Sequence, residues 1–156
     1  MLKDELALPL HSRFKSGTEW EPIGFFSNSL CCADRFDLML GFFSSTAINV
    51  LSDGFASFLY HDGRMRMIIN DFLSQEDKTA IMVGEDTLSL PYFDIKNIRQ
   101  LRATLSKRDR HFFECLAWLI RHDRIEIRII SPKHEGGISH TKTGIFSDGK
   151  NMIAFE

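Results

Sequence analysis

Two basic residues near the C-terminal end of the sequence, His140 and Lys142, have the types and spacing that phosphate chemistry uses. A neutral imidazole can attack phosphorus and leave again, and a neighbouring ammonium can neutralise charge on the phosphoryl oxygens. A carboxylate can fix the tautomer of the imidazole, and Asp148 is the candidate for that role. Taken alone, such a pair is more often a solvated strand face than a catalytic site. The pair by itself therefore leaves both interpretations open.

The stretch that carries this pair has the pattern of two antiparallel strands. Polarity alternates from Ile138 to Phe146, Asp148-Gly149 favours a turn, and Met152–Phe155 is an apolar return strand. The period of two puts His140 and Lys142 on one face of the first strand. The sequence thus predicts a C-terminal β-hairpin from which an imidazole and an ammonium point the same way.

Alternating strands and helices are predicted upstream of the hairpin. Phe36–Phe43 has the apolar run of a buried strand, a helix follows from Ser44 or Ser45 to the Asp62-Gly63 stop, and Arg64–Asn70 is a second strand. Strand, helix and strand in succession imply a right-handed crossover and parallel pairing. Alternation in Ile125–Ile130 predicts a third strand. An α/β fold with a mixed sheet is therefore expected.

Polar residues at the ends of these strands are candidates for binding substrate. Backbone N–H groups at the helix start after Ser44 or Ser45 could hold a phosphate, although a plain helix cap is the alternative. Asn70, with Asp71, could line the same edge of the sheet or simply form a turn. Ser44, Ser45 and Asn70 are therefore the predicted substrate-binding residues.

The rest of the sequence is less specific. Residues 1–21 are expected to form a largely irregular leader, and a helix is predicted from Pro22 to near Asp34. One or two helices with exposed loops are expected within residues 73–105. The basic run Lys107–His111 invites a nucleic-acid interpretation, but a solvated helix start is favoured because Asp109 interrupts the run.

Composition bounds the class of protein. The 156 residues, 44% hydrophobic and 26% charged, predict one globular domain. A formal net charge of −2 argues against a protein that coats nucleic acid by bulk charge, although a nuclease needs only a local basic surface. No signal peptide or membrane-spanning run is visible, and a cytoplasmic location is predicted.

Cysteine and histidine spacing gives no sign of a metal site or a disulfide framework. Cys31, Cys32 and Cys115 sit in apolar surroundings and are interpreted as reduced core thiols. No Cys-x-x-Cys or His-x-x-x-His occurs, so neither a metal nor another cofactor is predicted.

The segment His140-Thr141-Lys142, with Asp148 downstream, resembles the His-x-Lys signature of the phospholipase D superfamily, which includes lipases, nucleases and restriction enzymes. Gly41–Ala47, Arg64–Asn70 and residues 116–130 resemble, in the same order, the phospholipase D-like domains that precede helicase modules in bacterial restriction and defence proteins. The resemblance covers residues 22–156.

The sequence departs from the family pattern in two places. Five residues separate Lys142 from Asp148, one more than in the most common pattern of the superfamily. Family members also continue past the return strand with a Gly-Ser-containing turn and an Asn, whereas this sequence stops at Glu156. The domain of residues 22–156 is therefore expected to be truncated at its C-terminal end.

The resemblance implies a fold and a mechanism. The fold is a mixed sheet flanked by helices on both faces, and the activity is a metal-independent nuclease of a restriction or phage-defence helicase protein, acting on DNA rather than RNA. His140 would form a phosphohistidine, and His140 of a second subunit would protonate the leaving oxygen. Lys142 would neutralise phosphoryl charge and Asp148 would orient a histidine. A symmetric homodimer is expected, because the sequence carries one of the two motifs that such a site needs.

Two other functions stay open. A catalytically inactive module for dimerisation or nucleic-acid docking is favoured by the missing Gly-Ser continuation, whereas the shared face of His140 and Lys142 favours chemistry. A lipid phosphodiesterase is less favoured, because no amphipathic or polybasic membrane-binding segment is visible.

Overall fold

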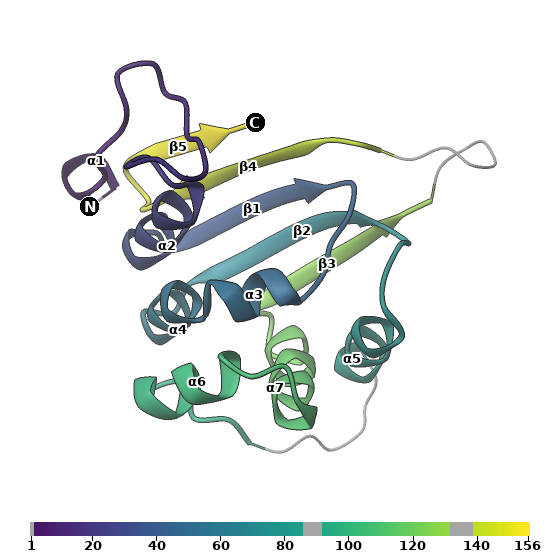
Figure 1. Cartoon of the computed structure of the whole chain (residues 1–156). Helices are drawn as coiled ribbons and strands as arrows, with labels where there is room; N and C mark the ends of the chain where they lie inside the picture. The colour runs from purple at the N-terminus through teal and green to yellow at the C-terminus, as the bar shows by residue number, and fades with distance from the viewer. Residues whose placement is uncertain (1, 86–91, 132–138) are drawn as a thin grey trace.

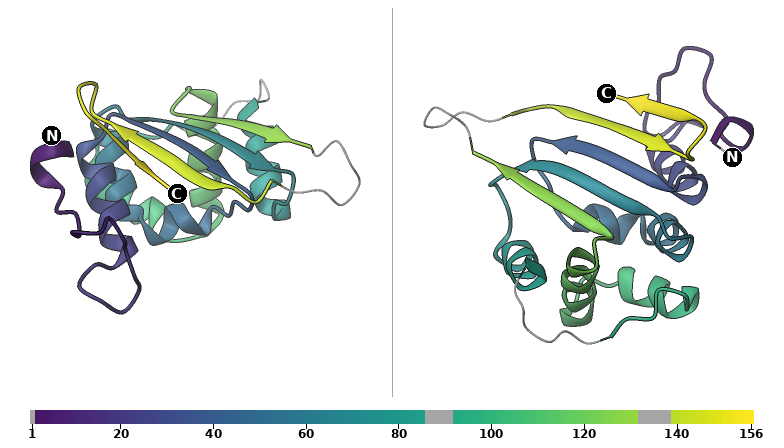
Figure 2. Two further views of the ribbon diagram at one scale, coloured as in Figure 1. Left: turned by 90° about the horizontal axis from the view of Figure 1, so that it is seen from above. Right: turned by 180° about the vertical axis from the view of Figure 1, so that it is seen from behind.

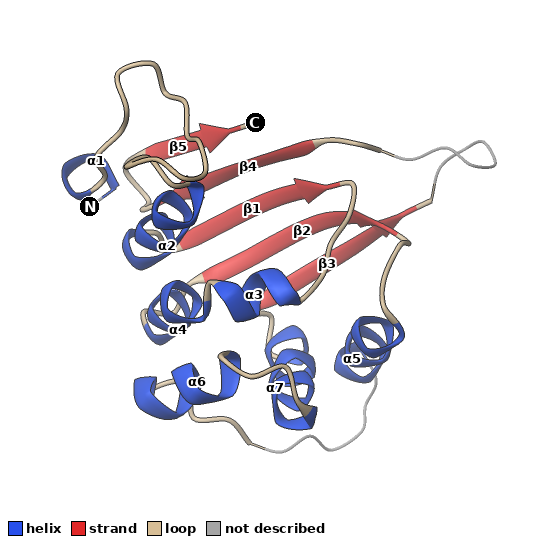
Figure 3. Cartoon of the chain, in the orientation of Figure 1, coloured by secondary structure: helices blue, strands red, loops and turns tan. Residues whose placement is uncertain are grey.

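The computed structural model describes residues 2–85, 92–131 and 139–156, which form a mixed α/β arrangement (Figure 1). Within these ranges there are seven helices and five strands (Figure 3). In chain order they are α1 (Leu2–Glu5), α2 (Pro22–Cys32), β1 (Arg35–Leu40), α3 (Thr46–Val50), α4 (Ser52–Tyr60), β2 (Arg64–Asn70), α5 (Gln75–Glu85), α6 (Ile98–Leu105), α7 (Arg110–Arg121), β3 (Ile125–Ile130), β4 (Lys142–Ser147) and β5 (Met152–Phe155).

The strands form one mixed sheet in the order β3-β2-β1-β4-β5 (Figure 1). The predicted parallel pairing is confirmed: β1 pairs with β2, and β2 with β3, in parallel. β4 lies antiparallel to β1, and β5 antiparallel to β4. Because β4 runs the opposite way, its first residue lies beside the last residue of β1. The edge of the sheet where β1, β2 and β3 end and β4 begins is called the carboxyl edge below.

Helices cover only one face of the sheet in the part of the chain that the structure describes (Figure 2). The expectation of helices on both faces is therefore wrong. The reason is visible in β2, where Met65 and Met67 are buried while Arg64 and Arg66 on the alternate row are exposed. A parallel strand buried on both faces needs a continuous apolar run, and β2 has only one apolar row.

Aromatic packing anchors β4 to the rest of the sheet. Phe36 of β1 and Phe146 of β4 stack with ring centroids 4.1 Å apart. Phe25 of α2 meets Phe146 edge to face at 6.0 Å. Burial of each such side chain stabilises the fold by about 2 kcal/mol. The covered face thus holds β4 beside β1 and fixes what lies at the start of β4.

Helix ends follow local chemistry at some predicted positions and not at others. The Asp109 side chain accepts a hydrogen bond from the Phe112 backbone N–H at 3.1 Å, so the basic run does precede a capped helix, α7. The helix predicted from Ser44 to the Asp62-Gly63 stop is interrupted at Leu51, which separates α3 from α4. Asp62 takes a left-handed φ of 66° at that stop.

The N-terminal segment has little regular structure. Residues 6–21 form no helix or strand, whereas Leu2, in the short helix α1, is fully buried. Cys115 is buried as expected, but Cys31 is exposed and is therefore not a core thiol. No helix in the described ranges is long and apolar enough to cross a membrane.

Candidate active site at the carboxyl edge

His140 and Lys142 lie at the carboxyl edge, beside the end of β1. Lys142 pairs with Leu40, and one further hydrogen bond joins the Gly41 N–H to the Thr141 carbonyl at 2.9 Å. β4 begins at Lys142, so His140 precedes the strand instead of lying within it; the predicted strand start, Ile138, is outside the described residues. Both side chains are exposed, and neither has a hydrogen-bond or ion-pair partner among the described residues.

The backbone around His140 is tightly packed against the turn that follows β1. A Cβ atom at Gly41 would overlap the Ser139 carbonyl oxygen and lie 3.1 Å from the His140 Cα atom. Only glycine allows this approach. The histidine is thus exposed in its side chain but fixed in its backbone.

Asn70, at the end of β2, supplies the second restraint on this segment. Its side chain is only 2% exposed. The Nδ2 atom donates to the Gly41 carbonyl at 2.8 Å and to the Ser139 carbonyl at 2.9 Å, and Oδ1 accepts from the Ser139 N–H at 3.4 Å. The structure brings Asn70 to the predicted edge, but its polar atoms are bonded to backbone. Asn70 therefore positions the His140 segment, in place of the predicted role in binding substrate.

The two predicted serines differ in accessibility. Ser44 is exposed, and its hydroxyl accepts from the N–H of Thr46, the first residue of α3, at 3.3 Å. Ser45 is fully buried; its N–H donates to an Asp77 carboxylate oxygen at 3.4 Å, and its hydroxyl accepts from Arg108 Nε at 3.4 Å. Of the two, only Ser44 has a hydroxyl open to solvent at the carboxyl edge.

Asp148 lies at the opposite end of β4 from His140. Ser147, its neighbour, pairs with Arg35 at the start of β1. A strand of six residues spans roughly 20 Å, so Asp148 cannot contact His140 of the same chain. The expectation that it orients this histidine fails within one chain, because the intervening residues are fully extended.

The Asp148 carboxylate instead closes the turn between β4 and β5. It accepts hydrogen bonds from the N–H groups of Asn151 at 2.6 Å, Leu2 at 2.9 Å and Lys150 at 3.0 Å. These bonds, with that from Asn151 foremost, hold the pKa of Asp148 well below its usual range. Asp148 thus ties α1 to the turn.

Two exposed aromatic residues at the carboxyl edge escaped the sequence analysis. Phe42 follows β1 and Phe72 follows β2, and their side chains are about half exposed. Phe42 belongs to the apolar run Phe36–Phe43, which predicts a buried strand, so nothing in the sequence indicated an exposed ring at this position. The signal available was its position after the end of a strand, where ligand-binding residues of α/β sheets gather.

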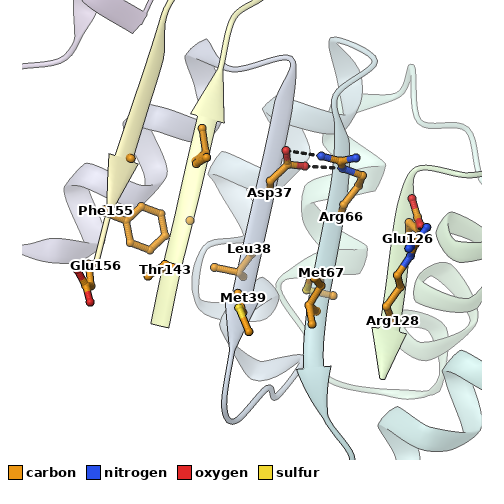
Figure 4. Close-up of a pocket in the computed structure, with 14 residues that line it drawn as sticks. Asp37, Leu38, Met39, Arg66, Met67, Glu126, Arg128, Thr143, Phe155 and Glu156 are labelled. Carbon is orange, nitrogen blue, oxygen red and sulfur yellow. Dashed lines mark hydrogen bonds and ion pairs between the residues drawn. The ribbon is translucent and has the colours of Figure 1, made fainter. Parts of the chain in front are cut away.

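The open face of the sheet carries a separate depression of about 680 Å³ (Figure 4). Asp37 accepts hydrogen bonds from the Arg66 Nε and terminal nitrogen atoms at 2.7 Å each, and Glu126 pairs with Arg128 at 2.9 Å. Hydrogen bonding by Arg66 keeps the pKa of Asp37 below its ordinary value. Asp37 and Arg66 are thus paired with each other, as are Glu126 and Arg128, and His140 and Lys142 do not line the depression.

Within the described ranges, no three His, Cys, Asp or Glu side chains lie close enough together to hold a metal ion.

Comparisons of the chain with protein-family models, with curated proteins and with solved structures found no match. The phospholipase D resemblance therefore stays a prediction.

Proposed function

We propose that this chain is a phosphodiesterase domain that cleaves nucleic acid without a metal ion, through a phosphohistidine intermediate on His140. One observation carries the proposal: His140 and Lys142 are both exposed and unpaired within the described residues, on a segment whose backbone is fixed by Asn70 and Gly41. Because the backbone is held in place while the two side chains have no partner in the described part of the chain, these side chains can meet a substrate in a defined geometry.

The proposed reaction has two steps. A nitrogen of the His140 imidazole attacks phosphorus and the bond to the leaving oxygen breaks, while His140 of a second subunit donates a proton to that oxygen. Water then attacks phosphorus, the second histidine accepts its proton, and the phosphorus–nitrogen bond breaks to release His140. Lys142 stabilises the negative charge that develops on the phosphoryl oxygens. Asp148 has no part in this scheme within one chain.

The partners follow from the same resemblance. Two histidines require a symmetric homodimer with both motifs at its interface. The proposed setting is a restriction or phage-defence protein in which a helicase domain or subunit contributes most of the affinity for DNA. This division fits the net charge of −2, which gives this chain little overall attraction for DNA. A cytoplasmic location belongs to the same proposal.

A second candidate function is a non-catalytic module for dimerisation or nucleic-acid docking. The observation that favours it is the separation of Asp148 from His140, because no carboxylate among the described residues bonds to the imidazole and fixes its tautomer. In this candidate function the fold and the carboxyl edge serve binding alone, and His140 has no role in catalysis.

Cleavage in excess EDTA tests the proposal. Single- and double-stranded DNA and RNA are incubated with the chain and with its His140→Ala and Lys142→Ala variants, at a concentration where sedimentation has established the oligomeric state. We expect cleavage that survives EDTA and falls by at least ~100-fold in both variants. His11→Ala, which removes an exposed histidine of the leader, is the matched control and should retain full activity. No cleavage by a folded dimer would leave the docking module as the function.

A further inference from the structure

Phe42 and Phe72 form an aromatic pair on the surface of the carboxyl edge. Their side chains are 53% and 51% exposed, and their ring centroids lie 5.6 Å apart with 41° between the planes. Neither ring belongs to the buried hydrophobic core. Single exposed apolar side chains are ordinary, but two exposed rings in contact with each other indicate a binding surface.

The pair adjoins the candidate active site. The Phe42 ring meets the His140 imidazole edge to face, with 6.4 Å between centroids. Lys142, two residues further along, adds a cation without an ion-pair partner among the described residues. Two π faces and a free ammonium thus lie at one edge of the sheet.

These groups match one class of ligand. A nucleotide has a flat π face on its base and an anion on its phosphate, joined only by the sugar, so a base stacked on Phe42 would keep its phosphate near His140. An apolar protein segment would cover the rings but leave the imidazole and ammonium unpaired. In a duplex the base faces are already stacked on one another, whereas unpaired bases can stack on aromatic side chains.

We propose that Phe42 and Phe72 are a base-stacking platform, and that the substrate of this edge is single-stranded nucleic acid. The inference rests on the proposed function for the assignment of His140 and Lys142 to the phosphate. It adds the substrate class and the two side chains that select it.

Binding is measured apart from cleavage, in the His140→Ala background, by fluorescence anisotropy of a labelled strand of about 12 nucleotides. The comparison strand is abasic, with the same length and phosphates but no bases, and a duplex of the same length is the third probe. We expect the base-bearing strand to bind ~10-fold more tightly than either the abasic strand or the duplex, since stacking on aromatic side chains accounts for the difference.

Matched variants assign the preference to the rings. Phe42→Leu combined with Phe72→Leu keeps apolar side chains of similar size without a π face, and should bind base-bearing and abasic strands equally. Phe42→Trp with Phe72→Trp should retain the preference. Tyr92→Leu removes an aromatic side chain that is 80% exposed and packs against Trp118 of α7, and should also leave the preference intact.

Several results would overturn the platform. One is equal binding of base-bearing and abasic strands by the chain with both rings in place. Another is a preference for base-bearing strands that persists in the double leucine variant. A third is a dimer of the parent chain that is lost in the double leucine variant, which would show that the rings contact a second copy of the chain. The EDTA assay reports separately on catalysis. Base-dependent binding without cleavage by the unmodified chain would defeat only the catalytic proposal, and cleavage without any preference for bases would defeat only the platform.

Discussion

Asn70 and Ser139 are joined by hydrogen bonds in both directions. The Asn70 Nδ2 atom donates to the Ser139 carbonyl at 2.9 Å, and the Ser139 N–H donates to Asn70 Oδ1 at 3.4 Å. The same Nδ2 atom also donates to the Gly41 carbonyl. Because Ser139 directly precedes His140, one buried amide at the end of β2 fixes the backbone that carries the proposed nucleophile.

Replacement of Asn70 by leucine should harm both stability and activity. Leucine has a similar size but leaves the Gly41 and Ser139 carbonyls without their donor, and such buried groups cost about 1–3 kcal/mol. We expect the free energy of unfolding, measured in urea, to fall by roughly 2 kcal/mol. Cleavage in EDTA should fall further than this loss of folded chain explains. Asn28→Leu, at an exposed site in α2, is the control and should stay near the parent. Parent-like cleavage by a folded Asn70→Leu chain would show that the amide does not position His140.

Gly41→Ala should disturb the active site through steric contact. The new Cβ would overlap the Ser139 carbonyl oxygen, so the His140 segment must shift, at a cost of about 1–3 kcal/mol in unfolding free energy. Cleavage should fall with it. Gly24→Ala is the matched change, because a Cβ there meets nothing within 4 Å on a helix, and it should stabilise the chain by up to about 1 kcal/mol. Equal effects of the two changes would contradict the close approach at Gly41.

Asp148→Asn should change the pH dependence of stability and leave catalysis intact. The folded-state pKa of Asp148 is depressed by the N–H groups of Asn151, Leu2 and Lys150, whereas in the unfolded chain it is about 3.9. The ionised carboxylate therefore stabilises the fold above about pH 4, and this contribution is lost as the pH falls further.

Thermal melts from pH ~7 down to pH ~2 test this expectation. The variant should melt at a lower temperature than the parent at neutral pH, and the gap should narrow as acid protonates the parent carboxylate. Asp53→Asn, at a surface position in α4, is the control. If Asp148→Asn abolishes cleavage while the chain remains folded, a role of Asp148 in catalysis, through another subunit, must be restored.

Thiol modification should separate the three cysteines. Burial raises the pKa of Cys115 to about 12, and burial together with a hydrogen bond to Glu5 raises that of Cys32 to about 11, whereas Cys31 is exposed. Because the thiolate is the reactive form, only Cys31 should react quickly with iodoacetamide at about pH 8. Mass spectrometry should find one rapid adduct per folded chain, none in Cys31→Ser, and three after denaturation of the parent. Rapid modification at Cys115 would contradict the packing of α7.

Local patterns were sufficient for much of the secondary structure. The sequence predicts β2 and β3 with the bounds that the structure has, Arg64–Asn70 and Ile125–Ile130, and it predicts the second of them from the alternation of its residues. The polar interruption at Asp109 predicts the start of α7. These features depend on residues within a few positions of one another, so the sequence contains their cause.

The arrangement of the candidate site was decided by the tertiary structure. The hydrogen bonds between Asn70 and Ser139 join residues 69 positions apart, and they arise because β4 lies beside β1 in an antiparallel register. That register brings His140 to the edge where Phe42 is exposed, and carries Asp148 to the opposite end of the strand. By itself, the sequence determined which groups could act on a phosphate. Which of them meet was decided only by strand pairing and by the covering of one sheet face, because both depend on packing between distant segments.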